Sequence, residues 1–291
     1  MTTTRSPLSQ AQSLAAPLPA LLAQAQRLAN AVLPGEHGRR RGGHGDAFWQ
    51  FRAAQPFDSA RQIDWRRSAR SDDSFVQEKE WQTAQSVAFW VDPSDSLQFA
   101  SLAALPSKSE RAQLLCLACA ILLDRGGERV GLTSATLPPK RGSAQIYAMA
   151  EKMSTQAATG TAPPDLSGLG PRSQLVLASD FLGDLAPVEQ AVAKAVSMGV
   201  QGVLLQVLDP QEEAFPFEGR TIFESMSGAL RHETRKADEL RPRYFERLAA
   251  RKDRLAQIAR AAGWQFATHR TDAPPAVMLQ WLCQMLGQRQ T

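Results

Sequence analysis

Short apolar stretches alternate with longer amphipathic ones after residue 85, and this alternation limits the fold more than any other feature of the chain. The apolar stretches have the length of strands, and the amphipathic ones have the length of helices. The pattern predicts strands at 87–91, 128–134, 174–179, 201–208 and 264–269, and helices at 108–125, 144–154, 187–198, 242–262 and 275–287. We therefore expect an α/β fold, a doubly wound and mainly parallel sheet with helices on both faces.

Three segments organise the 291 residues. Residues 1–34 are rich in Ala, Leu and Gln and predict an N-terminal helical extension. Residues 35–84 predict a loop, a strand at 48–51, a short helix at 61–70 and an edge strand at 75–81 that leads into the first core strand. Residues 85–291 form the α/β domain. Pro242 is expected in the first turn of its helix.

Composition and charge indicate a globular chain. Hydrophobic residues make up 43% of it, and the longest apolar run, 114–123, has about half the length of a membrane span. No signal peptide is recognised and three cysteines make no disulfide framework, so we expect the cytoplasm. The net charge is +4 and the isoelectric point is 9.2.

Arginines concentrate in the first quarter of the chain, at Arg39–Arg41 and again at Arg61, Arg66, Arg67 and Arg70. No nucleic-acid-binding module accompanies them, which favours a solvated or protein-contacting face. Binding of nucleic acid by this basic patch remains an alternative.

The strand at 87–91 ends on Asp92-Pro-Ser94-Asp-Ser96, which puts three oxygen-bearing side chains on one short loop. Mg²⁺ and Mn²⁺ prefer such hard oxygen ligands, and three of them leave positions open for water or for a carboxylate of a partner. The other interpretation is a simple turn, with a serine capping the next helix.

A second strand, 174–179, ends on Asp180. The carboxyl ends of parallel strands meet at one edge of a sheet, so Asp92 and Asp180 are expected there together. This convergence favours a metal site over two unrelated turns. Asp180 as the cap of the following helix is the alternative.

These residues resemble known families. The Asp-x-Ser-x-Ser loop with a later strand-end aspartate resembles the metal-ion-dependent adhesion site of von Willebrand factor A domains. From about residue 34 onward the chain also resembles the bacterial family catalogued as domain of unknown function 58. That second resemblance rests on Arg41-x-Gly43-x-Gly45, Phe48, Arg52, Arg61-x-Ile63-Asp64-Trp65, Ser68-Ala69-Arg70 and the C-terminal phrase 263–272.

The resemblance implies a von Willebrand factor A-like module that binds proteins and is not an enzyme. Its partner would be a MoxR-type AAA+ ATPase or that ATPase's client, for which it would act as an adaptor. The implied cofactor is Mg²⁺ or Mn²⁺, held by Asp92, Ser94, Ser96 and Asp180. The adhesion-site threonine has no clear counterpart, and Ser143 is the nearest hydroxyl, with Thr136 behind it.

Two further segments are candidates for partner contact. Asp95 lies on the Asp92 loop, and Asp209, Phe215 and Phe217 lie on an acidic loop after the strand at 201–208. The acidic loop is equally a loop pinned in place by its aromatic residues. In the signature segment we expect Asp64 to pair with arginines and Trp65 to pack inward as scaffold, with partner contact as the alternative.

Motifs for catalysis are largely missing from the sequence. Cys116 and Cys119 have redox-motif spacing but lie in an apolar helix, so buried inert thiols are expected. There is no nucleophile elbow and no phosphate-binding loop. One enzymatic alternative is magnesium-dependent phosphoryl transfer with Asp92 as nucleophile and Asp180 on the metal.

Overall fold

The structure, a computed structural model, divides the chain into two compact units. One unit comprises Met1–Pro34 with Gln85–Thr291, and the other is Gly35–Ala84. The structure describes residues 17–32, 42–43, 47–55, 58–59, 61, 63–69, 73–80, 84–156, 163–224, 226, 228 and 231–287.

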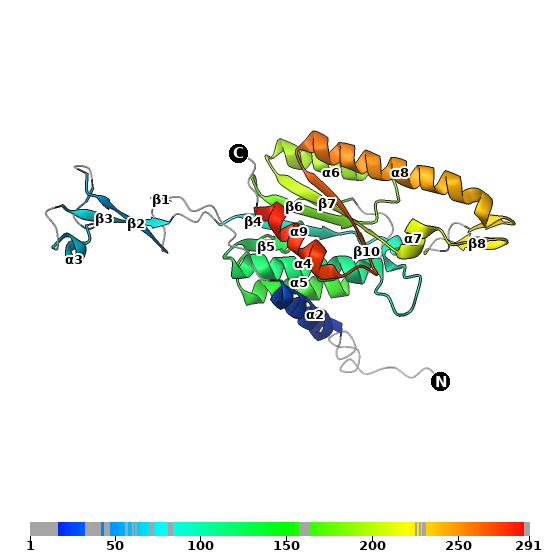
Figure 1. Ribbon diagram of the computed structural model, residues 1–291, viewed down its shortest axis with the longest axis horizontal. Helices are drawn as coiled ribbons and strands as arrows, with labels where there is room; N and C mark the ends of the chain where they lie inside the picture. Colours follow the sequence, from blue (N-terminus) through cyan, green and yellow to red (C-terminus); the bar gives the residue numbers. More distant parts are fainter. Residues whose placement is uncertain are drawn as a thin grey trace. The chain divides into compact units, whose positions relative to one another are not determined.

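The larger unit is built on a five-stranded sheet in which every strand pair is parallel. The strand order is β10-β7-β6-β4-β5 (Figure 1). The strands are β4 (Ser86–Val91), β5 (Arg129–Leu132), β6 (Gln174–Ser179), β7 (Gln201–Leu208) and β10 (Gln265–Arg270). The parallel α/β architecture expected from the alternating pattern is thus confirmed.

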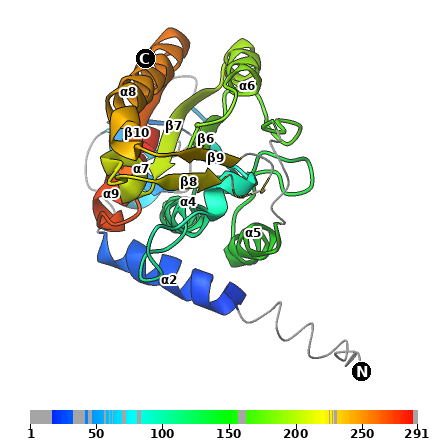
Figure 2. The same cartoon turned by 90° about the vertical axis from the view of Figure 1, so that its right-hand side faces the viewer.

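Helices cover both faces of this sheet (Figure 2). Along β4, alternate residues point to opposite faces, so Phe89 belongs to one apolar cluster and Trp90 to the other. The Phe89 face is covered by α4 (Lys108–Arg125), α5 (Ser143–Thr155) and α9 (Pro275–Gly287). The Trp90 face is covered by α6 (Ala186–Ser197) and α8 (Ala237–Ala262).

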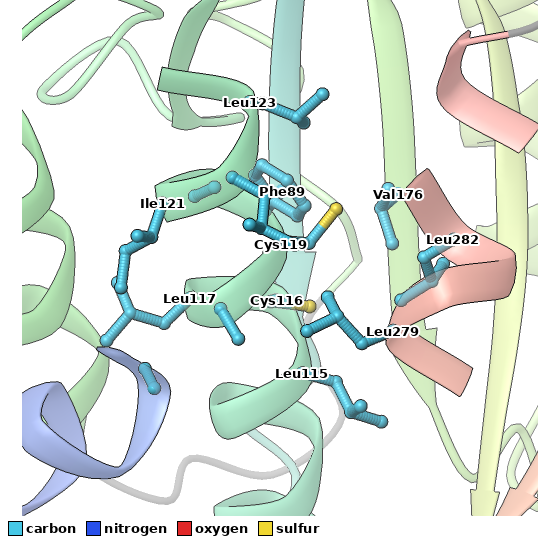
Figure 3. Close-up of a cluster of buried hydrophobic side chains, with 14 of the residues drawn as sticks. Phe89, Leu115, Cys116, Leu117, Cys119, Ile121, Leu123, Val176, Leu279 and Leu282 are labelled. Atoms are coloured by element: carbon cyan, nitrogen blue, oxygen red, sulfur yellow. The ribbon is translucent and has the colours of Figure 1, made fainter. Parts of the chain in front are cut away.

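Helix α4 lies at the centre of the larger cluster and is apolar almost all round. It begins with a capping box between Ser107 and Glu110 and buries most of its residues. Figure 3 shows Cys116 and Cys119 of α4 among side chains of the sheet and of α9. All three cysteines are buried and free, and burial raises the pKa of the Cys116 thiol to about 12. The thiols of α4 are therefore protonated core groups, as expected.

The N-terminal segment packs on the larger unit instead of extending away from it. Helix α2 (Pro17–Ala31) lies against α4, α5 and α9, so it forms a further layer outside the helices of the Phe89 face. Its buried side chains are Leu22, Ala25 and Ala29. Their spacing of three and four residues places them on one face of the helix.

The smaller unit contains its own three-stranded antiparallel sheet, in the order β1-β3-β2. Its elements are β1 (Gly42–Gly43), β2 (Ala47–Ala53), α3 (Trp65–Ser68) and β3 (Phe75–Glu80). The strand expected at 75–81 as an edge strand of the domain is therefore the middle strand of a separate sheet. The weak alternation of its residues did not indicate which sheet they join.

Asp64 and Trp65 of the signature segment differ from expectation. Asp64 is the N-cap of α3, and its carboxylate accepts a hydrogen bond of 3.0 Å from the backbone N–H of Arg67. Trp65 does not pack inward, because 61% of it is exposed. The guanidinium of Arg67 instead lies 4.2 Å from the centre of the Phe51 ring. This cation–π contact joins α3 to β2.

Several short elements were not expected from the sequence. After β4 comes the 3₁₀ turn η1 (Asp95–Gln98), and after β7 come α7 (Pro210–Ala214) and a hairpin of β8 (Thr221–Glu224) and β9 (Arg231–Thr234). Pro242 lies inside α8, which begins five residues before it. In the part of the chain that the structure describes, no helix is both long and apolar enough to cross a membrane.

Candidate functional site

The strand order reverses beside β4, and this creates the place where parallel sheets bind ligands. The chain leaves β4 for α4 on one face and leaves β6 for α6 on the other, although β4 and β6 are neighbours in the sheet. A crevice forms at the carboxyl ends of two such strands. We call the edge of the sheet at its carboxyl strand ends the carboxyl rim. Asp92 follows β4 and Asp180 follows β6 on this rim.

Asp92 is partly buried and is held from two sides. Its Oδ1 accepts a 2.8 Å hydrogen bond from the backbone N–H of Ser94, and its Oδ2 accepts a 2.5 Å bond from the hydroxyl of Ser179. Burial raises the pKa of the Asp92 carboxyl, and the negative charge of Asp180 raises it further, whereas these hydrogen bonds lower it. The net direction is upward.

No basic side chain in the described part of the chain pairs with Asp92. Among the described residues, its charge is therefore balanced by hydrogen bonds alone. A partly buried carboxylate without a cationic partner is costly to ionise. Asp92 is for this reason a position where an added cation would relieve an existing cost.

The hydroxyls of Ser94 and Ser96 form a hydrogen bond with each other on the same loop, with their Oγ atoms 3.0 Å apart. Ser94 stands at the N-cap of η1, but its side chain makes no capping hydrogen bond. Ser96, the serine at the end of the loop, lies inside η1, and the hydrogen bond from the Ser94 N–H to Asp92 is that of a turn. Asp95, the first residue of η1, is partly buried.

Asp180, in contrast to Asp92, is paired with a cation from the described part of the chain. Its Oδ2 lies 2.8 Å from the ammonium nitrogen of Lys108, whose side chain is 1% exposed. The same nitrogen lies 2.6 Å from Oε1 of Glu212. Lys108 opens α4 and Glu212 lies in α7, so this buried triad joins the segments that follow β4, β6 and β7.

The triad shifts the protonation of its members. Burial by itself would lower the pKa of Lys108, but the charges of Asp180 and Glu212 outweigh burial and raise it. Burial raises the pKa of the Glu212 carboxyl, and the attraction of Lys108 only partly offsets this. Lys108 is thus firmly cationic at neutral pH. Sequence reasoning missed Lys108 and Glu212 because no local pattern links residues so far apart along the chain.

Ser143 is not part of the site. It is the exposed first residue of α5, and the backbone N–H of Gly142 beside it donates to Asp124 near the end of α4. Helix α4 begins at the carboxyl rim and is about 27 Å long, so its end lies at the opposite edge of the sheet. The prediction of Ser143 as a ligand is corrected. The hydroxyl of Thr136 bonds to that of Ser134, at 2.9 Å, in the loop after β5.

The acidic loop after β7 is pinned by its aromatic residues, which was the second of the two interpretations. Asp209 is fully buried, caps α7 and accepts a 2.9 Å hydrogen bond from the backbone of Ser101. Phe215 is 5% exposed and contacts Phe217, Phe223 and Tyr244. Asp209 and Phe215 are therefore corrected from partner contacts to structural residues. Phe217 remains partly exposed.

A metal at the rim would need hydroxyl oxygens. The described residues contain no group of three or more His, Cys, Asp or Glu side chains arranged to hold a metal ion. The Asp92 loop offers one carboxylate and two hydroxyls, which is the donor chemistry of Mg²⁺ rather than of Zn²⁺.

Comparison with known proteins identifies the family. A family model described as "Protein of unknown function DUF58" matches residues 50–254, which is more than half of the chain. The chain belongs to the DUF58 family. The family predicted from the signature segment is thereby confirmed, and the match includes both Asp92 and Asp180.

Relatives of this DUF58 chain are found in mycobacteria. Uncharacterized proteins Rv1480 of Mycobacterium tuberculosis and Mb1516 of Mycobacterium bovis are each 25% identical to it over 274 residues, which covers 89% of this chain and 85% of the relative.

Two solved structures have some similarity in fold. BatB from Bacteroides thetaiotaomicron has a TM-score of 0.41 and 15% identity, and covers 69% of this chain and 96% of its own. An aerotolerance-related membrane protein from Bacteroides fragilis has a TM-score of 0.40 and 18% identity, and covers 69% and 97%.

Proposed function

We propose that this DUF58 chain is a non-enzymatic protein-binding module with a von Willebrand factor A-like fold. Its binding centre is the loop of Asp92, Ser94 and Ser96, which holds Mg²⁺ or Mn²⁺ weakly. Its partner is a MoxR-type AAA+ ATPase or a client of that ATPase. The partner class comes from the family resemblance, whereas the binding centre is supported by the residues themselves.

One observation carries the metal proposal, the 3.0 Å between the Oγ atoms of Ser94 and Ser96. Ligands of Mg²⁺ lie at about 2.1 Å in octahedral geometry, so neighbouring ligands are separated by about 3.0 Å. The two hydroxyls therefore have the spacing of adjacent magnesium ligands. The uncompensated carboxylate of Asp92 on the same loop supplies the negative charge that such a cation requires.

Asp180 has a different part in this proposal from the one first expected. Lys108 already neutralises it and occupies one of its oxygens, and the backbone N–H of Leu182 donates to the other at 3.0 Å. Because the triad has two carboxylates and only one ammonium, the charge of Asp180 still acts on Asp92, and Asp180 does not need to ligate the ion directly. A set of three protein ligands is consistent with a weak site.

A bound cation would supply an open coordination position for a carboxylate of the partner. The residues of the chain have simpler tasks: Asp92 anchors the ion, the two serines fix its place, and Ser179 with the backbone of Ser94 holds the Asp92 carboxylate in one orientation. Binding should then depend on the divalent cation and on an acidic residue of the partner.

The proposal is tested with a purified MoxR-type ATPase from the same organism as the chain. Biolayer interferometry measures its binding to immobilised wild type, Asp92→Asn and Glu151→Gln, in magnesium and in chelator without nucleotide. Glu151 is an exposed carboxylate on α5, so it is a matched control for the loss of one charge. We expect Asp92→Asn to abolish binding and Glu151→Gln to leave it unchanged. Equal binding by both variants would show that the ATPase docks elsewhere.

A further inference from the structure

A cavity of about 390 Å³ opens on the carboxyl rim directly beside the Asp92 loop. It lies where the ends of β4, β5 and α5 meet. Its walls include Trp90, Pro93, Leu132, Thr133, Ser134 and Met153. The size is within the range of pockets that accept a small ligand or one or two side chains.

The walls of this cavity favour an apolar occupant. Trp90, Pro93, Leu132 and Met153 give it an apolar lining, and Thr133 is almost fully buried. Transfer of an apolar side chain from water into such a cavity is favourable. A highly charged metabolite would find few partners there.

The charged groups at the border of the cavity are few. The carboxylate of Asp165 is held by the backbone N–H and the hydroxyl of Ser167, both at 2.9 Å. The side chain of Lys152 is exposed. Among the described residues at this border, Lys152 therefore supplies an exposed positive charge, which complements an acidic ligand.

Pro93 connects the cavity to the proposed metal site. It lines the cavity and stands in the chain between Asp92 and Ser94, so the wall of the cavity is one residue away from two of the proposed ligands. An extended peptide advances about 3.3 Å per residue. A segment with a carboxylate on the ion would therefore present a side chain one or two residues away to the cavity.

We propose that this cavity is a specificity pocket for the partner. It accepts an apolar side chain that lies one or two residues from the acidic residue bound at the metal, and Lys152 favours further negative charge in the same segment. The inference rests on the proposed function, since the acidic residue is what brings the segment to the rim. The ligand class is thus an extended acidic segment with an apolar side chain beside its key carboxylate.

A displayed library of random peptides tests the pocket without knowledge of the partner. Peptides are selected on the full chain in magnesium, and the selected sequences are then bound to variants. We expect an Asp or Glu with Leu, Ile, Met or Phe at a fixed offset of one or two. Replacement of that apolar residue by Ala should weaken binding about tenfold or more, the effect of removing one buried side chain.

Two plugging variants address the pocket from different walls. Ser134→Trp fills it from the loop after β5, and Thr155→Trp fills it from α5. Ala135→Trp is the matched control, because Ala135 is exposed and does not line the cavity. Circular dichroism establishes that each variant is folded. We expect both plugs to weaken peptide binding at least tenfold and the control to have no such effect.

The outcomes separate the pocket from the metal site. The selected peptides could need the acidic residue, magnesium and Asp92 but no apolar neighbour, and could bind the plugged variants normally. That result would overturn the pocket, while the proposed function would stand. If Asp92→Asn binds the selected peptides as well as wild type does, the proposed function itself fails, and the pocket's role beside it fails too.

Discussion

At the scale of single residues, Asp92 and Asp180 of the carboxyl rim have opposite surroundings. Asp180 is neutralised by Lys108, which is buried and lies 2.8 Å away. Asp92, its neighbour on the adjacent strand, has hydrogen bonds but no cation in the described part of the chain. The ion pair with Lys108 thus gives Asp180 a structural role, whereas the carboxylate of Asp92 stays available for an added cation. This asymmetry is why we place the ion at Asp92.

Loss of Lys108 should destabilise the fold strongly. Lys108→Met leaves the carboxylates of Asp180 and Glu212 buried and unpaired, which costs roughly 3–5 kcal/mol of the free energy of unfolding. Lys194→Met, on the exposed side of α6, is the control and should change stability by less than about 0.5 kcal/mol. Urea denaturation at pH 7 measures both. A normal stability for Lys108→Met would show that the triad is not a balanced charge cluster.

Acid should weaken the fold through His269. Burial lowers the pKa of its ring to about 4, with the charge of Arg111 acting in the same direction. Below pH 6.5 the ring takes up a proton in the unfolded chain but not in the folded one. The free energy of unfolding therefore decreases as the pH is lowered from 6.5 to about 4. The loss is roughly 2 kcal/mol between pH 7.5 and pH 5. His269→Gln should lose less than wild type in the same denaturation series, and an equal loss would rule out His269 as the cause.

At the scale of elements, the signature segment shows how a motif can be structural without being buried. Asp64 fixes the start of α3, and Arg67 of that helix stacks on Phe51. The Trp65 ring faces solvent. An exposed tryptophan beside arginines is suited to contact with another molecule, so the partner-contact interpretation of this residue gains from the structure.

The two signature residues should therefore respond differently to substitution. Asp64→Ala removes the N-cap and should cost about 1 kcal/mol of the stability of the smaller unit. Trp65→Ala removes an exposed side chain and should change it by less than about 0.5 kcal/mol. Thermal unfolding of the full chain, followed by hydrogen exchange in residues 63–80, measures each effect. A large loss for Trp65→Ala would mean that this ring is buried in solution.

Elements with a strong local signal were predictable from the sequence. Helix 108–125 has a capping box at its start, and the strands 174–179 and 201–208 are mostly apolar, so their bounds were predicted to the residue. The hairpin of β8 and β9 was missed because its strands have only four residues each and none of these residues is buried, so no apolar stretch marks them. Pairing between distant residues, as in the triad of Lys108, leaves no local signal at all.

The candidate site was predictable in part for the same reason. Its location follows from the topology, because strand ends carry Asp92 and Asp180 to one rim. Ser143 was predicted as a ligand only because of its place in the sequence. After β5 the chain turns back, so that Lys140 pairs with Val130 in an antiparallel bridge, and this brings Ser143 to the opposite edge of the sheet. The cavity beside Pro93 is formed by three elements that are separate in the sequence.

At the scale of the whole molecule, the chain has one unit that contains the rim and a second that contains most of the signature. Helix α2 belongs to the first unit although residues 35–84 separate it from the rest in sequence. Its apolar face completes the cover over α4, α5 and α9. The first unit can therefore be complete only when its N-terminal helix is present.

Substitutions on the two sides of α2 should test this dependence. Leu22→Asp puts a charge into the contact with α4 and should lower the thermal midpoint of the larger unit by several degrees. Gln26→Asp adds the same charge on the exposed side of the same helix and should leave the midpoint nearly unchanged. Similar midpoints for the two variants would show that α2 does not stabilise the unit.

The most direct test of the account is the thermal midpoint of wild type and Asp92→Asn with and without millimolar Mg²⁺ or Mn²⁺ at pH 7. Burial raises the pKa of Asp92 above its ordinary value of 3.8, so ionisation of this carboxyl lowers the stability of the folded state as the pH rises. Without metal, Asp92→Asn should be at least as stable as wild type. Added cation should raise the midpoint of wild type and of the Glu151→Gln control, and leave Asp92→Asn unchanged. A metal site at this loop would be contradicted if neither cation changed the thermal midpoint of wild type, or if the midpoint of Asp92→Asn rose by the same amount.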